Sequence, residues 1–245
     1  MGNIHISGSG RVAADGSEYD EVRISGSGRI SGTLHCKSIG VSGSGRFEDA
    51  VVCEGDTRMS GSGHFDGDLD SNTVHVSGAG KFARSVRCNQ MRVSGAVKVG
   101  GNVDGGDITL SGAANIDGGV NAEHIRISGV STIGGLLNAE HIEIRLGGLN
   151  QISEIGCSRL EVVPDGALTR GFHFSLFGKR FGTGGARTLE TNIIEGDELL
   201  LCDTRAKVVR GKLVQIGPGC EIGRVEYTDR LEVDPTSEVA EQVRL

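Results

Sequence analysis

The sequence contains few large side chains. Aromatic residues make up 4% of the 245 residues, tryptophan is absent and proline occurs three times. Protein interiors are close-packed, so a chain without large rings must fill its core with small branched residues. We therefore expect many thin layers instead of one thick core.

Features that mark several common functional classes are also missing. The six cysteines form no C-x-x-C pair, which excludes zinc-ribbon and thioredoxin spacing. No apolar run is long enough to cross a bilayer, and no signal peptide precedes the first repeat. We expect a cytoplasmic protein with free thiols. A net charge of −7 and a pI near 5.5 disfavour nucleic acid as the partner.

Catalytic signatures are equally scarce. The sequence has no Ser-His-Asp spacing, no phosphate-binding loop and no H-E-x-x-H motif. Gly-x-Gly recurs often, but always inside the repeat and never before a helix, so it does not indicate phosphate binding. We predict no catalytic residue, no cofactor and no metal.

What the chain does have is glycine, 41 residues of it, arranged with a fixed period. Ser-Gly pairs begin at residues 7, 25, 42, 60, 77, 94, 111 and 128, at intervals of 17 or 18 residues. A fixed period of this length indicates a repeat architecture.

Apolar residues recur two apart within each repeat, which is typical of strands. One row of equivalent positions begins Ile4, Val22, Ile39, and the row two residues later begins Ile6, Ile24, Val41. Three such short runs per 17 residues predict three strands per coil. The sequence therefore predicts an all-β, single-stranded parallel β-helix of roughly 12 coils, in which each coil contacts only its neighbours.

One glycine position is kept in each of the first eight coils. The position two residues later is permissive, because Val97, Ala114 and Ser131 occupy it in later coils. The strict position predicts a corner with positive φ or a close backbone approach. Its members are Gly8, Gly26, Gly43, Gly61, Gly78, Gly95, Gly112 and Gly129.

The repeat is interrupted once. We expect regular coils over 1–162, an irregular phenylalanine-rich insertion or hairpin over 163–198, further coils over 199–233, and a polar tail over 234–245 that is frayed or a short helix. The insertion carries a candidate contact for a partner or a membrane surface, with the alternative that its rings pack on the rod wall. The residues of that contact are Phe172, Phe174, Phe177 and Phe181.

Outward positions carry two further patterns. Basic residues recur at two positions of the coil, as an electrostatic track or as a solubilising face balanced by acids. The two rows are Arg11, Arg29, Arg46, His64, Lys81, Lys98 and His5, Arg23, Arg58, His75, Arg92, Arg126. His124 and His141, beside Glu123 and Glu140, are one period apart, which repetition explains better than a metal site.

Cys36, Cys53 and Cys88 share an inward row with small residues, which favours packing over redox chemistry.

The motif Ile-x-Ile-Ser-Gly-x-Gly-x-Ile-x-Gly-x-Leu resembles that of the bactofilins, bacterial polymer-forming cytoskeletal proteins. It stands in residues 22–34, 108–120 and 125–137. The resemblance implies a right-handed, roughly triangular β-helix that polymerises through its end coils, without nucleotide, into non-polar filaments. It also implies scaffolding of envelope, cell-shape or motility machinery, with itself or a paralogous bactofilin as the polymer partner. Direct membrane binding, at the inner face of the membrane, stays open.

The ends of the predicted rod suggest how it assembles. A coil begins at Ile4 with no capping element before it, and an uncapped coil is a template for pairing with another copy. We expect exposed apolar residues at both edges: Ile4, Ile6 and Val12 on the first coil, and Leu231 and Val233 on the last. Two alternatives from other functional classes remain. Residues 216–223 look like two hexapeptide repeats of an acyltransferase, and secreted β-helical polysaccharide-active or adhesin domains share the architecture.

Overall fold

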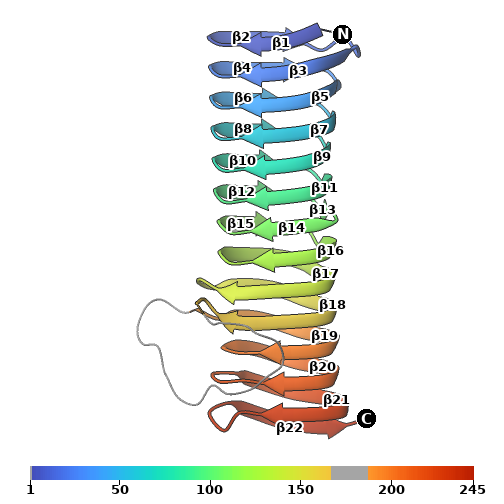
Figure 1. Ribbon diagram of the computed structural model, residues 1–245, viewed down its shortest axis with the longest axis vertical. Coiled ribbons are helices and arrows are strands. Elements are labelled where there is room, and N and C mark those ends of the chain that lie inside the picture. Colours follow the sequence, from blue (N-terminus) through green and yellow to red (C-terminus); the bar gives the residue numbers. More distant parts are fainter. Residues whose placement is uncertain (1, 167–186) are drawn as a thin grey trace.

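The computed structural model describes residues 2–166 and 187–245, and these form one straight parallel β-solenoid (Figure 1). The described residues contain strands and turns but no helix, in about 13 turns spaced by about 17 residues. The predicted all-β parallel β-helix is thereby confirmed. The phenylalanines of the predicted contact, Phe172, Phe174, Phe177 and Phe181, lie outside the described residues.

Regular turns with short strands occupy about the first half of the chain. Their strands are β1 (Gly2–Ile6), β2 (Ser9–Ala13), β3 (Glu18–Ile24), β4 (Ser27–Ser31), β5 (Leu34–Val41), β6 (Ser44–Phe47), β7 (Val51–Met59), β8 (Ser62–Phe65), β9 (Leu69–Val76), β10 (Ala79–Phe82), β11 (Val86–Val93), β12 (Ala96–Val99), β13 (Val103–Asp104), β14 (Asp107–Leu110), β15 (Ala113–Ile116) and β16 (Val120–Ile127). Each pairs in parallel with its equivalent one turn away, as Ile4 does with Val22 and Val22 with Ile39.

The later strands, except the last, run through the corners and are longer. They are β17 (Val130–Leu146), β18 (Asn150–Pro164), β19 (Leu189–Leu201), β20 (Thr204–Ile216), β21 (Glu221–Val233) and β22 (Glu238–Arg244). Where the Ser-Gly corner is lost, buried Asn150 accepts a hydrogen bond from the Ser131 hydroxyl at 2.7 Å and donates to the carbonyls of Gly129 and Gly148. A buried polar side chain thus satisfies the backbone at the irregular corner.

The predicted inward rows form the core. Ile24, Met59, Val93 and Ile127 of one row are at most 1% exposed. In a second row, Phe47, Phe65 and Phe82 stack ring on ring, with centroids 4.4 and 5.0 Å apart. The few aromatic residues of this part of the chain are therefore concentrated in one continuous ladder along the axis.

The strict glycines are explained by a close approach of backbone and not by positive φ. A Cβ on Gly61 would lie 2.1 Å from the carbonyl oxygen of Gly43, and one on Gly43 would lie 2.0 Å from that of Gly26. Among the described residues, positive φ at glycine is confined to Gly16, Gly32, Gly166 and Gly219. At the permissive position a Cβ meets side chains instead, and Val97 is accommodated at 4% exposure.

Two predicted boundaries are wrong. The interruption is shorter than 163–198, because β18 continues to Pro164 and β19 already begins at Leu189. The expected frayed or helical tail contains β22, which pairs in parallel with β21. Both corrections add strand to the rod, so the turns number about 13 where the sequence predicted roughly 12.

Candidate functional site

The two ends of the rod carry the predicted assembly residues. At the N-terminal end β1 pairs only with β3 and β2 only with β4, so within the described residues the outer edges of both strands are uncovered. At the C-terminal end, β22 pairs with the first part of β21. The open edge therefore consists of β22 together with residues 229–233 of β21, which β22 does not cover. Figure 1 shows these ends at opposite extremes of the rod.

The apolar side chains at the first edge are less exposed than predicted. Ile4 and Ile6 are only 6% and 7% exposed, because both point inward and are covered by their own turn. Val12, Leu231 and Val233 are half-buried and pack against the core. What the ends offer is therefore backbone hydrogen-bonding groups together with a thin apolar rim.

Gly8 differs from the other strict glycines. No described atom lies within 4 Å of the place where its Cβ would be, whereas a Cβ on Gly26 would lie 2.1 Å from the carbonyl oxygen of Gly8. The close contact with a backbone carbonyl that requires glycine inside the rod is thus absent at the N-terminal end. A further turn stacked on this end would supply that contact.

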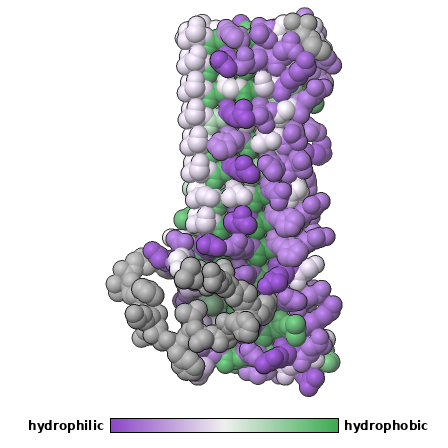
Figure 2. Space-filling view, viewed as in Figure 1, coloured by the Kyte–Doolittle hydropathy of each residue, from purple (hydrophilic) through white to green (hydrophobic). Residues whose placement is uncertain are grey.

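The basic rows are stacked in register, as predicted, but acids neutralise much of them. Arg29 pairs with Glu48 at 3.3 Å and Arg46 with Asp66 at 2.8 Å. In the second row, Arg23 pairs with Glu21 and Arg58 with Asp56, both at 2.6 Å. Figure 2 shows hydrophilic residues along one side of the rod, narrow hydrophobic stripes beside them, and a pale column along the left edge. This pairing favours the solubilising face over a bare cationic track.

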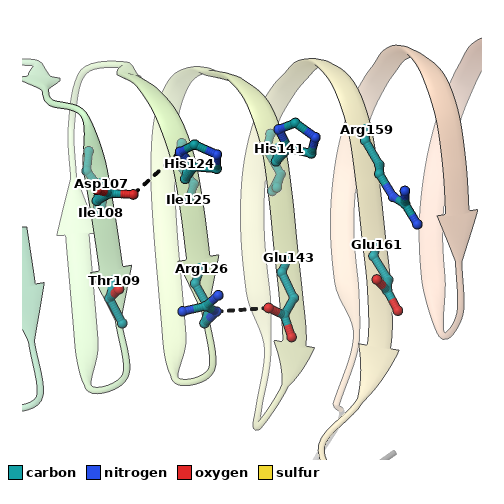
Figure 3. Close-up of a pocket in the computed structure, with 11 residues that line it drawn as sticks. Asp107, Ile108, Thr109, His124, Ile125, Arg126, His141, Glu143, Arg159 and Glu161 are labelled. Carbon is teal, nitrogen blue, oxygen red and sulfur yellow. Dashed lines mark hydrogen bonds and ion pairs between the residues drawn. The ribbon is translucent and has the colours of Figure 1, made fainter. Parts of the chain in front are cut away.

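A shallow groove of about 270 Å³ crosses four turns near the middle of the wall (Figure 3). The rings of His124 and His141 stack there with centroids 5.4 Å apart, and His124 Nδ1 lies 3.5 Å from the Asp107 carboxylate. No group of three or more His, Cys, Asp or Glu residues in the described part of the chain is placed to hold a metal ion. The histidine pair therefore stacks along the ladder instead of converging on one point.

In the same groove, the Glu143 carboxylate accepts hydrogen bonds from Arg126 Nε at 2.9 Å and Arg145 Nε at 2.6 Å. Burial raises the pKa of Glu143, but the two guanidinium groups outweigh burial and hold the pKa below its usual value. A pKa that is lower in the folded state means that ionised Glu143 stabilises the fold above its unfolded pKa, and that this contribution is lost as the pH falls.

We expect Glu143→Gln to lower the free energy of unfolding by up to about 1 kcal/mol at pH 7. The difference from the parent should begin to shrink as the pH falls below the unfolded pKa of about 4.3, and it should close once the pH is below the lower pKa of folded Glu143. Urea unfolding at pH 7 and pH 3.5 measures both. Exposed Glu140, replaced by glutamine, is the matched control. An equal loss at the two pH values would contradict the assigned ion pair.

All six cysteines are free. Burial raises the pKa of Cys88, Cys157 and Cys220 to about 12. Nucleophilic and metal-binding chemistry requires the thiolate, so these three thiols are inert at neutral pH. This agrees with a packing role for Cys88, the member of the predicted cysteine row among these three.

In the described residues, no helix is long and apolar enough to cross a membrane. The hexapeptide-like stretch of residues 216–223 forms a single tight turn with Gly219 at a φ of +76°. Around it the turns are 15 to 17 residues long, as shown by the pairs Leu189–Thr204, Arg205–Glu221 and Glu221–Glu238. The acyltransferase alternative requires a six-residue period, which this part of the rod does not have.

Comparisons with known proteins agree with the repeat. Two proteins of Bacillus subtilis (strain 168) are similar: "Uncharacterized protein YhbF", 38% identical over 106 residues, and "Uncharacterized protein YhbE", 44% identical over 57 residues. The first match covers 42% of this chain and 40% of the relative, and the second covers 23% and 24%. The chain thus spans well under half the length of either relative. No solved structure matches it.

A family model also matches the chain, over the segment that runs from β6 into β17. The family is described as polymer-forming and cytoskeletal. The resemblance that the repeat indicates is therefore confirmed for residues 45–136, which match the bactofilin family.

Proposed function

We propose that this protein is a non-enzymatic scaffold subunit that assembles end to end into filaments without a nucleotide. The polymer-forming family matched by residues 45–136 supports this proposal. The filament would position envelope, cell-shape or motility machinery. Its polymer partner would be a second copy of the chain or a paralogous bactofilin.

The observation that carries the proposal is the uncovered edge of β1 and β2. Each strand inside the rod has a parallel neighbour on both sides, whereas these two have a described neighbour on one side only. Unpaired edge strands recruit further strands, because their N–H and C=O groups lack partners. A stacked copy would satisfy these groups and cover the rim formed by Val12.

The place of action is part of the proposal. Six free thiols favour a reducing compartment, so we propose the cytoplasm. For a peripheral position at the inner face of the membrane, the candidate contact lies outside the described residues. The candidate is the segment with Phe172, Phe174, Phe177 and Phe181, and deleting it tests whether vesicle binding depends on it.

A Val12→Lys substitution tests the assembly edge. Val12 is half-buried at the end of the rod, so the lysine ammonium can reach water in the isolated protein but would be buried in an end-to-end joint. We expect the critical concentration for assembly, measured by sedimentation, to rise at least tenfold, while the circular dichroism spectrum and the melting temperature stay close to those of the parent.

Val52→Lys is the matched control, because Val52 is 38% exposed on the wall of β7, away from both ends. It should assemble like the parent. Equal loss of assembly in the two variants would point to lateral contacts, and unchanged assembly of Val12→Lys would count against the end-to-end joint.

A further inference from the structure

Cys36 and Cys53 lie side by side in the core of the rod. They are buried and in register on the neighbouring strands β5 and β7, one turn apart. In-register residues on neighbouring parallel strands lie about 4.8 Å apart, and disulfides span about 4.4–6.8 Å between Cα atoms. The Cys53 Sγ also lies 3.6 Å from the carbonyl oxygen of Lys37, so it leans toward the turn that holds Cys36. The backbone therefore places the two thiols where a disulfide can join two turns.

Hydroxyl groups surround this pair, although it lies in the core. Thr57 is fully buried and stands between the apolar residues Ile39 and Val74 of its row. Ser71, also buried, follows Cys53 in the cysteine row, and its Oγ lies 3.0 Å from Thr57 Oγ1. Both hydroxyls are within hydrogen-bonding range of the Cys53 side chain. They can therefore stabilise a negative charge on its sulfur.

A hydrogen bond between the two thiols separates their ionisation. This bond from Cys36, together with those from Thr57 and Ser71, outweighs burial and lowers the pKa of Cys53. The same bond and burial raise the pKa of Cys36. A larger share of Cys53 than of the remaining thiols is therefore thiolate at neutral pH, and the thiolate is the nucleophile. Burial raises the pKa of those remaining thiols to about 12: Cys88, Cys157, Cys202 and Cys220.

An open hollow of about 650 Å³ in the wall of the rod reaches this part of the core. Cys53, Ser71, Cys88 and Gly105 are among the residues that line it. The hollow brings solvent up to Cys53, whose own side chain is buried. Burial restricts the reactant to a small molecule, and thiolate character next to a second thiol suits reaction with a peroxide.

We propose that Cys36 and Cys53 are a peroxide-sensitive thiol pair, and that oxidation joins β5 to β7 by a reversible disulfide. The Cys53 sulfur attacks one oxygen of hydrogen peroxide, the O–O bond breaks, and Cys53 becomes a sulfenic acid while hydroxide leaves. The Cys36 sulfur then attacks the Cys53 sulfur. The S–S bond forms, the S–O bond breaks, and the proton of Cys36 joins the departing hydroxide as water.

Over both steps the two thiols give up two electrons and two protons, and hydrogen peroxide becomes two molecules of water. Oxidation of Cys53 also removes the negative charge beside Cys36, so the second thiol becomes easier to ionise when it has to attack. The disulfide would lie inside the rod, away from both assembly edges. This inference therefore does not depend on the proposed end-to-end assembly.

Peptide mapping of the full-length chain after treatment with hydrogen peroxide tests the pair. We expect two of the six free thiols to be lost, Cys36 and Cys53 to appear in one disulfide-linked peptide, and dithiothreitol to restore both. Cys53→Ser should slow the loss of thiols at least about tenfold, because the remaining thiols are protonated. Cys36→Ser should leave Cys53 as a sulfenic acid that dimedone labels, because the second thiol is missing.

Cys88→Ser is the matched control, because Cys88 belongs to the same row and Ser71 shows that serine fits that row. This variant should form the linked peptide as the parent does. An oxidised parent without the linked peptide would overturn the proposal, and so would a folded Cys53→Ser variant that loses thiols at the parent's rate. Disulfides that join Cys53 to Cys88, or that join two chains, would overturn the pairing. If circular dichroism shows that a serine variant is unfolded, the linked peptide of the parent decides alone.

Discussion

Replacing Gly61 by alanine is expected to destabilise the whole rod, whereas the same substitution at Gly8 should leave the fold intact and prevent assembly. A Cβ on Gly61 would lie 2.1 Å from the carbonyl oxygen of Gly43 and 2.4 Å from that of Ser42. Backbone atoms cannot turn aside as a side chain does. We expect a loss of about 3 kcal/mol in unfolding free energy, at the upper end of the usual cost of overpacking.

At Gly8 the same methyl group meets no described atom within 4 Å. Gly8→Ala should therefore unfold at the parent's urea concentration, but its methyl group would occupy the space into which the next rod must pack. We expect the critical concentration for assembly to rise at least tenfold. The two variants form a matched pair, since the substitution and the corner are the same.

Urea unfolding and sedimentation of Gly8→Ala and Gly61→Ala measure the two effects. Normal assembly of Gly8→Ala would show that no turn stacks closely on the N-terminal end. A Gly61→Ala variant as stable as the parent would mean that the corner can open, and would remove the explanation of the glycine row.

Phe65→Ala is expected to cost about 3–5 kcal/mol in unfolding free energy, the range for removing a buried aromatic ring. Phe65 is fully buried between Phe47 and Phe82, with ring centroids at 4.4 and 5.0 Å. Backbone ladders on both sides hold the neighbouring turns at their spacing, so the cavity cannot collapse by moving a turn.

Phe65→Leu is the control, because it keeps most of the apolar volume and should cost less than half as much. Thermal or urea unfolding of the two variants decides between these expectations. A loss below about 1 kcal/mol for Phe65→Ala would contradict the ladder as a main source of stability.

The sequence predicted the regular part of the rod well, because the inward rows repeat at a constant spacing. Ile24 and Val41 share a row in the sequence, and they pair in the fold. The start of β19 was missed because the spacing shortens there: Leu189 pairs with Thr204. β22 was missed because Glu238, Glu241 and Arg244 make it polar, and strand pairing to β21 forms it despite that composition.

The residues of the candidate assembly edges lie at the two ends of the rod, but they are less exposed than the sequence predicted. Alternation showed that Ile4 and Ile6 point inward, yet only the folded turn shows that the turn itself already covers them. The sequence offered acids that balance the basic rows as one interpretation, but it did not show which side chains pair. Arg46 meets Asp66, which lies one turn away and outside its own row, and only the path of the corner brings the two together. The sequence places Gly8 in the row of strict glycines, but it does not show that the space around its Cβ position is open.

Electron microscopy of the purified full chain without nucleotide tests the central claim most directly. The account predicts filaments about as wide as one rod, which appear above a critical concentration and sediment with the protein. A chain that stays monomeric at high concentration, whatever the salt and with or without nucleotide, would contradict end-to-end assembly.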